Sequence, residues 1–130
     1  MTATQKVRVL LADDEKHVRQ LVKAILMPLN CEIVGEAENG AQAFDLYQQL
    51  KPDVVFLDVN MPVRDGKAAL KDILGFNQNA VVIMLTSMSD ANTVQAAVEQ
   101  GAAYYIRKDT PPVEMRELIK DTWRQYHLID

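Results

Sequence analysis

Short apolar runs alternate with longer amphipathic stretches along this chain, and the alternation occurs five times. Short runs rich in β-branched and other apolar side chains predict strands. The predicted strands span residues 7–12, 31–36, 54–57, 81–85 and 103–107. The run Val54-Val55-Phe56-Leu57 is apolar at every position, which is typical of a parallel strand that is buried on both faces.

Between these runs, apolar residues recur at the spacing of one helix face. The first predicted helix carries Val18, Leu21, Val22, Ile25 and Leu26. Pro28 ends it, because proline lacks the amide hydrogen and its ring clashes with the preceding turn. The corresponding residues of the next three helices are Ala43, Phe44, Tyr47 and Leu50; Ala69, Leu70, Ile73 and Leu74; and Val94, Ala97 and Val98.

Turn and capping residues mark the ends of the other elements. Asn39-Gly40 predicts a turn before the second helix. Ser89 or Asp90 caps the fourth helix, which stops at Gly101. For the last helix, Thr110 is the predicted cap, and proline follows it at the first helical position. That helix buries some of Met115, Leu118, Ile119, Trp123 and Tyr126.

The five strand–helix units predict a doubly wound α/β fold, in which one parallel sheet carries helices on both faces. A chain of 130 residues fits one domain, and no linker or internal repeat divides it. In such sheets, ligands bind beyond the carboxyl ends of the strands. The polar residues of interest follow strands: Asp13 and Asp14, Asp58, Thr86 with Ser87, and Lys108.

Carboxylates at the ends of two buried strands converge only if a cation offsets their repulsion, because otherwise one of them would stay protonated. Asp13, Asp14 and Asp58 therefore predict a divalent metal, Mg²⁺ or Mn²⁺, which both favour oxygen ligands. Lys108 adds a positive charge and Thr86 a hydroxyl donor. Such a set suits a phosphoryl group, whose transfer depends on positioning and charge stabilisation. Asp58 is the candidate nucleophile.

The overall composition narrows the classes of function. Apolar residues make up 48% of the chain and charged residues 25%, as in ordinary globular proteins. The net charge of -4 gives no indication of binding to nucleic acid or to an anionic membrane, because both attract basic proteins. The apolar run of residues 80–85 is too short to span a bilayer. Cys31 stands alone, so cytoplasm is the simplest compartment, and a small buried hydrophobe is its expected role.

The order of the polar motifs resembles that of bacterial two-component response regulator receiver domains of the CheY-like superfamily. The motifs are Asp13-Asp14, Asp58 with Met61-Pro62 and Asp65-Gly66, Thr86, and Tyr105 three residues before Lys108. The resemblance covers nearly the whole chain. It implies a flavodoxin-like sheet of five strands in the order 2-1-3-4-5.

The resemblance also implies a role for each site residue. Asp58 would be the phosphoacceptor. Asp14 and Asp58 would bind the metal directly, with the backbone carbonyl of Asn60, and Asp13 would act mainly through water. Lys108 would contact the phosphoryl group.

The same resemblance implies a switch. Thr86 would hydrogen-bond the phosphoryl group, and Tyr105 would swing inward when Thr86 moves. Phosphorylation would thereby change the surface made by the fourth helix, fifth strand and fifth helix.

The implied partners are a sensor histidine kinase or a histidine phosphotransfer protein, and a downstream protein target. No direct contact with nucleic acid or membrane is expected, nor turnover of an external substrate. Either a monomer or a phosphorylation-linked homodimer fits.

The chain departs from the receiver pattern at Asp109, where such domains usually carry proline after the lysine, often with a cis bond. A cis bond before a non-proline residue costs about 2.5–4 kcal/mol, so a trans Lys108–Asp109 bond is expected. A second hypothesis concerns Met88, whose apolar side chain would slow hydrolysis of the acyl phosphate.

Several alternatives stay open. The chain could be a receiver cut from a longer transcriptional regulator, or a degenerate receiver used only for interaction. An aspartate-dependent phosphohydrolase would need a second acid at the position of Asn60, and a flavodoxin-like cofactor binder would need a phosphate loop after the first strand. Residue by residue, Asp13-Asp14 could be a solvated helix start and Tyr105 could be core. His17 and His127 are expected on the surface.

Overall fold

The computed structural model describes residues 6–87 and 91–130 of the chain. Five parallel strands form one sheet in the order β2-β1-β3-β4-β5, which confirms the predicted fold and strand order. The strands are β1 Val7–Ala12, β2 Cys31–Ala37, β3 Val54–Asp58, β4 Val82–Thr86 and β5 Tyr104–Arg107. The helices are α1 Lys16–Leu26, α2 Gly40–Leu50, α3 Gly66–Phe76, α4 Ala91–Gln100 and α5 Pro112–Gln125.

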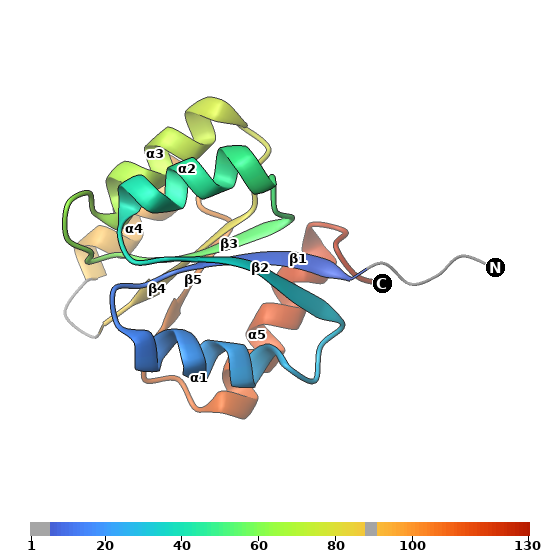
Figure 1. Ribbon diagram of the computed structural model, residues 1–130. Coiled ribbons are helices and arrows are strands. Elements are labelled where there is room, and N and C mark those ends of the chain that lie inside the picture. The colour runs from blue at the N-terminus through green and yellow to red at the C-terminus, as the bar shows by residue number, and fades with distance from the viewer. Residues whose placement is uncertain (1–5, 88–90) are drawn as a thin grey trace.

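The sheet lies between two helical layers. Helices α2, α3 and α4 cover one face, and α1 and α5 cover the other (Figure 1). Because side chains alternate along a strand, β3 sends Val55 and Leu57 into the first layer and Val54 and Phe56 into the second. All four are completely buried, as the uninterrupted apolar run predicted. Trp123 of α5 is also completely buried, within the second core.

The element boundaries differ from the predicted ones by about one residue, within the usual uncertainty of helix and strand ends. The predicted cap at Thr110 is wrong. The Thr110 amide donates to the Arg107 carbonyl at 3.0 Å and closes a turn, so α5 begins at Pro112 with Pro111 as its N-cap. Gly101 ends α4 as predicted, in the left-handed region at φ 119°. The cap predicted at Ser89 or Asp90 lies outside the described residues.

One helix face also differs from expectation. Val22, Ile25 and Leu26 of α1 are buried, but Leu21 is 45% exposed. The remaining buried position of α1 is taken by a cation, Arg19. Within residues 6–87 and 91–130, no helix is long and apolar enough to cross a membrane.

The loop between β3 and α3 is held close to the end of β3 by two glycines. The Gly66 amide donates to the Val59 carbonyl at 2.9 Å, and the Gly40 amide of α2 donates to the Arg64 carbonyl at 2.7 Å. A Cβ atom at Gly66 would collide with the backbone carbonyl of Asp58, and one at Gly40 would collide with that of Arg64. Both positions therefore require glycine for close backbone approach.

In the same loop, Val63 lies at φ 66°, a left-handed conformation that is unusual for a β-branched residue. The Arg64 amide donates to the Pro62 carbonyl at 2.6 Å across it, as in a γ-turn. The side chain of Arg64 then forms a bidentate pair with Asp72 of α3, at 2.6 and 2.9 Å. The loop that follows Asp58 is thus fixed by contacts on both sides.

We predict that Gly66→Ala destabilises the protein by about 1–3 kcal/mol, because the new methyl group must displace the end of β3. Gly75→Ala is the matched control. Gly75 is exposed in α3, and an added Cβ atom would meet nothing within 4 Å. Alanine favours helix over glycine by up to about 1 kcal/mol, so this variant should be as stable as the wild type or more so. Urea unfolding of both variants measures the difference, and equal stabilities would contradict the close approach at Gly66.

Candidate functional site

The predicted site residues come together at the carboxyl edge of the sheet. Asp13 follows β1, Asp58 ends β3, Thr86 ends β4 and Lys108 follows β5. Strands β1, β3 and β4 are almost completely buried, so their polar side chains emerge where the core stops, whereas the edge strand β5 is mostly exposed before Lys108. The Lys108 amide donates to the Thr86 carbonyl at 2.7 Å, which extends the β4–β5 pairing up to the lysine.

The ammonium group of Lys108 lies between two buried carboxylates. Its Nζ is 2.9 Å from Asp58 Oδ1 and 3.0 Å from Asp13 Oδ2. Asp13 and Asp58 are only 2% and 3% exposed. Buried carboxylates require a counter-charge, and Lys108 is the cation that contacts both.

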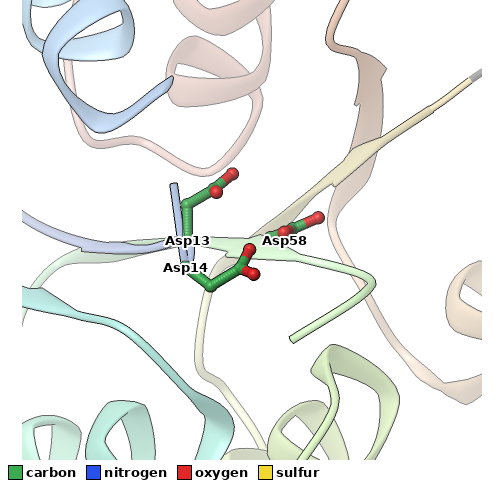
Figure 2. Close-up of side chains that lie close together, drawn as sticks. All are labelled: Asp13, Asp14 and Asp58. Carbon is green, nitrogen blue, oxygen red and sulfur yellow. The ribbon is translucent and has the colours of Figure 1, made fainter. Parts of the chain in front are cut away.

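Asp14 completes an acidic cluster. One carboxylate oxygen from each of Asp13, Asp14 and Asp58 lies within 4.8 Å of the others, and Asp14 is the exposed member. Figure 2 shows Asp13 and Asp14 leaving the end of β1, with the carboxylate of Asp14 directed toward Asp58. Three converging carboxylates with an opening to solvent suit a hard divalent cation, because Mg²⁺ takes oxygen ligands and keeps several waters.

The electrostatic state of Asp58 reflects this crowding. Burial, together with the charge of Asp13, raises the pKa of Asp58 from 3.8 to about 6, although Lys108 and the Asn60 amide act in the opposite direction. Burial alone would lower the pKa of Lys108, but its contacts with Asp58 and Asp13 hold that pKa above its usual value. The lysine therefore remains charged at neutral pH, and Asp58 is ionised at a cost in stability.

The other predicted residues surround this centre. The Asn60 amide donates to Asp58 Oδ1 at 3.3 Å, so the chain turns tightly around the Asp58 carboxylate. Thr86 is 1% exposed, and its Oγ1 finds no hydrogen-bond partner among residues 6–87 and 91–130. Such a buried hydroxyl costs about 1–3 kcal/mol if left unpaired, so Thr86 Oγ1 is free to donate a hydrogen bond to a group placed beside it.

Tyr105 lies on the edge strand β5 and is 39% exposed. Its ring stacks on that of Tyr104, with centroids 5.5 Å apart. The alternative that Tyr105 belongs to the core is therefore wrong in this conformation. Its role in switching stays a prediction, and Met88 lies outside the described residues.

The turn that follows Lys108 contains no cis peptide bond, as expected for Lys108–Asp109, and none occurs elsewhere in the described chain. Asp109 instead pairs with Arg107, whose nitrogens lie 3.0 and 2.6 Å from its two oxygens. The residue that replaces proline thus closes this turn with an ion pair on the surface.

Sequence reasoning missed one residue of this site. The guanidinium group of Arg19 donates to the backbone carbonyl of Asp13 and to Glu36 Oε1 of β2, although the residue is only 8% exposed. The signal was a charged residue three positions before Val22, on the buried face of a predicted helix. Charged residues are rarely that buried unless they are paired.

The remaining expectations concern single residues. Cys31 is half-buried against the core beside α1 and α5, and burial raises the pKa of its thiol, so the apolar role is supported. His17 is exposed as expected, with its ring 3.7 Å from Glu15. Asp65 is the N-cap of α3 and accepts a hydrogen bond from the Ala68 amide at 2.9 Å.

Comparison with known proteins agrees with this geometry. Residues 9–120 match the response regulator receiver domain family. The chain is 44% identical over 112 residues to Protein CcdB of Bacillus subtilis, which covers 86% of this chain and 93% of that protein. It is 38% identical over 115 residues to the chemotaxis protein CheY of the same organism, covering 88% of this chain and 96% of that protein.

A solved structure supports the same assignment. The CheX–CheY–BeF3–Mg²⁺ complex from Borrelia burgdorferi superposes with a TM-score of 0.84 at 26% identity, over 89% of this chain and 88% of that one. The chain therefore belongs to the response regulator receiver domains, the signalling domains of two-component systems. Its fold is that of the CheY-like group.

We predict that Asp58→Asn stabilises the protein. A folded-state pKa near 6 against an ordinary value of 3.8 means that the folded state binds the proton more tightly, so stability falls as pH rises through that window. Because each pKa unit corresponds to about 1.4 kcal/mol, Asp58→Asn should gain about 3 kcal/mol at neutral pH. Thermal unfolding across this pH range, without divalent cations, measures the gain.

The control for that measurement is Asp53→Asn, at the opposite end of β3. Asp53 is exposed and accepts a hydrogen bond from the Arg8 amide, which asparagine can also accept. This variant should leave the stability unchanged, because the hydrogen bond is kept. If Asp58→Asn behaves in the same way, the carboxylate of Asp58 is not destabilised by its surroundings.

Proposed function

We propose that this chain is a phosphoacceptor switch, which takes a phosphoryl group onto Asp58 from the phosphohistidine of a sensor histidine kinase or phosphotransfer protein. The observation that carries the proposal is the contact of Lys108 Nζ with Asp58 Oδ1 at 2.9 Å, beside the acidic cluster. A carboxylate that is buried, oriented and accompanied by a cation meets the requirements of a phosphoryl acceptor.

The proposed transfer conserves atoms and charge. An Asp58 carboxylate oxygen attacks phosphorus, the new O–P bond forms, and the bond from phosphorus to the donor nitrogen breaks. The histidine leaves with its electron pair. Lys108 stays within reach of the oxygens and offsets their negative charge, as charge stabilisation at the equatorial oxygens requires. Water later attacks phosphorus, which releases inorganic phosphate and restores Asp58.

The donor set of the site fits Mg²⁺ or Mn²⁺. Asp14 and Asp58, with the backbone carbonyl of Asn60, would hold the ion, and Asp13 would act mainly through water. When bound, the ion supplies positive charge that offsets both the carboxylates and the phosphoryl oxygens. The fit rests on three carboxylates converging within 4.8 Å, two of them buried.

Phosphorylation of Asp58 would first change the charge of the site and then the packing of the side chains around it. The unpaired hydroxyl of Thr86 is poised to donate a hydrogen bond to a phosphoryl oxygen. A shift of Thr86 toward Asp58 would open space beside β5, into which the exposed Tyr105 could turn. The surface formed by α4, β5 and α5 would then differ between the two states and select a downstream protein target, acting as a monomer or as a phosphorylation-linked homodimer.

A phosphohydrolase is the competing proposal on this geometry. Such an enzyme needs an acid to protonate the leaving group, and the corresponding position holds Asn60, whose side chain is no acid. We therefore propose that the chain promotes phosphorylation of its own Asp58 and turns over no external substrate.

We predict that incubation with acetyl phosphate and Mg²⁺ adds one phosphoryl group to the intact protein. Asp58→Asn should abolish the addition, and so should chelation of the metal. Asp65→Asn is the control: it makes the same change in the next loop, and asparagine also caps helices well. Intact-mass measurement over time follows the product.

Three results of this experiment exclude the proposal. No added mass on the wild type removes the phosphoacceptor function. Addition that survives Asp58→Asn places the chemistry elsewhere. Continuous release of phosphate from an unrelated phosphomonoester, at a rate lost with Asp58→Asn, favours the phosphohydrolase.

A further inference from the structure

Arg19 is a buried cation that lies behind the acidic cluster rather than in it. It extends from α1, and its side chain is 9% exposed. Burial of a guanidinium group requires several acceptors, because it carries five N–H donors. The acceptors here are the Asp13 carbonyl and the Glu36 carboxylate, at 2.5 and 3.0 Å.

The contact with Asp13 completes the fixation of that residue. The Asp13 amide donates to the Ala37 carbonyl at 3.0 Å, and Oδ1 accepts from the Glu15 amide at 2.9 Å. Oδ2 lies 3.0 Å from Lys108 Nζ. With Arg19 on the carbonyl, the amide, the carbonyl and Oδ1 of Asp13 are hydrogen-bonded, and Oδ2 is held by the ion pair with Lys108, which lacks hydrogen-bond geometry. The direction in which the chain leaves β1, and hence the placement of Asp14, depends on that carbonyl.

Glu36 connects this contact to the edge of the sheet. It accepts from Arg19 and, at 2.8 Å, from Lys23 Nζ, while its own strand β2 pairs with β1. The hydrogen bond from Lys23, together with that from Arg19, holds the pKa of Glu36 below its usual value. Glu36 therefore remains an anion at neutral pH and holds the guanidinium group in place.

We propose that Arg19 is a positioning residue for the cation site, acting through the backbone of Asp13. It holds the β1–α1 corner so that the carboxylates of Asp13 and Asp14 face Asp58. The inference rests on the proposed function, since the cation is the one that phosphoryl transfer to Asp58 requires. Its distinctive feature is that a positive residue would strengthen the binding of a positive ion.

Electrostatics and positioning predict opposite effects for the loss of Arg19. The guanidinium group repels a divalent cation, so its removal should by charge alone tighten binding. Removal also frees the Asp13 carbonyl and the corner that carries two ligands, which should weaken binding. Residues that orient metal ligands typically contribute about 10–100-fold in affinity. The sign of the change therefore separates the two mechanisms.

Lys23→Gln is the matched control. It removes one positive charge from the same network, and Lys23 contacts Glu36 rather than Asp13. Charge alone then predicts tighter binding for both variants, at least as strongly for Arg19→Gln as for Lys23→Gln, because Arg19 lies nearer the cluster. Positioning predicts that only the arginine variant weakens binding.

The experiment measures Mn²⁺ binding to the unphosphorylated protein by electron paramagnetic resonance of the free ion. We expect Arg19→Gln to weaken Mn²⁺ affinity about tenfold and Lys23→Gln to leave it unchanged or slightly tighter. Arg19→Lys should fall between wild type and Arg19→Gln, because lysine keeps the charge but lacks the fork that reaches both acceptors. Wild-type affinity in Arg19→Gln, or tightening equal to that of Lys23→Gln, overturns the proposal.

Two further readouts keep the result interpretable. If Arg19→Gln does not fold, Arg19→Lys carries the test, and wild-type affinity in that folded variant overturns the proposal. Phosphorylation by acetyl phosphate at increasing Mg²⁺ should show a higher half-saturating concentration for Arg19→Gln with most of the maximal rate recovered. If the wild type binds Mn²⁺ but takes no phosphoryl group, the proposed function is wrong. The role of Arg19 is then decided by the Mn²⁺ binding measurements alone.

Discussion

The placement of one ammonium group between two buried carboxylates is the interaction on which the site depends. Lys108 lies 2.9 Å from Asp58 and 3.0 Å from Asp13, and it is the last residue that the β4–β5 pairing holds in place. Without it, two carboxylates that are 2% and 3% exposed would face each other with no counter-charge. The parallel sheet makes this arrangement possible, because it brings the ends of β1, β3 and β5 to one edge.

Uncharged residues hold the carboxyl edge of the sheet in place. Strand β3 is completely buried from Val54 to Leu57, so the position of Asp58 is fixed by packing on both faces. Gly66 lets the next loop fold back onto the Asp58 backbone, and the loop is tied to α2 through Gly40. A carboxylate fixed in this way is oriented before any ligand arrives, which lowers the free-energy cost of binding one.

Much of the fold and the centre of the site followed from the sequence. The apolar runs placed the strands to within about one residue, and the polar residues after them marked the edge where they meet. The buried position of Arg19 was not predicted, because the apolar periodicity identifies the buried face of a helix by its hydrophobic residues. A charged residue on that face interrupts the pattern. The left-handed backbone of Val63 was not predicted either, because β-branched residues favour extended structure. Only tertiary contacts hold Val63 at φ 66°.

The two cationic side chains near the site, Lys108 and Arg19, would affect the binding of a divalent cation in different ways. Lys108 contacts the carboxylates of Asp13 and Asp58 directly and lies in the negative field that a divalent ion would share. Arg19 contacts Asp13 through its backbone carbonyl and otherwise pairs with Glu36. Yet burial leaves the pKa of Asp58 near 6 despite Lys108, so the protein alone does not satisfy its own cluster. That unsatisfied charge reduces the stability of the fold and would be relieved by a bound cation. Relief of this instability would therefore contribute to the free energy of binding a cation, beside the contribution of correctly placed ligands.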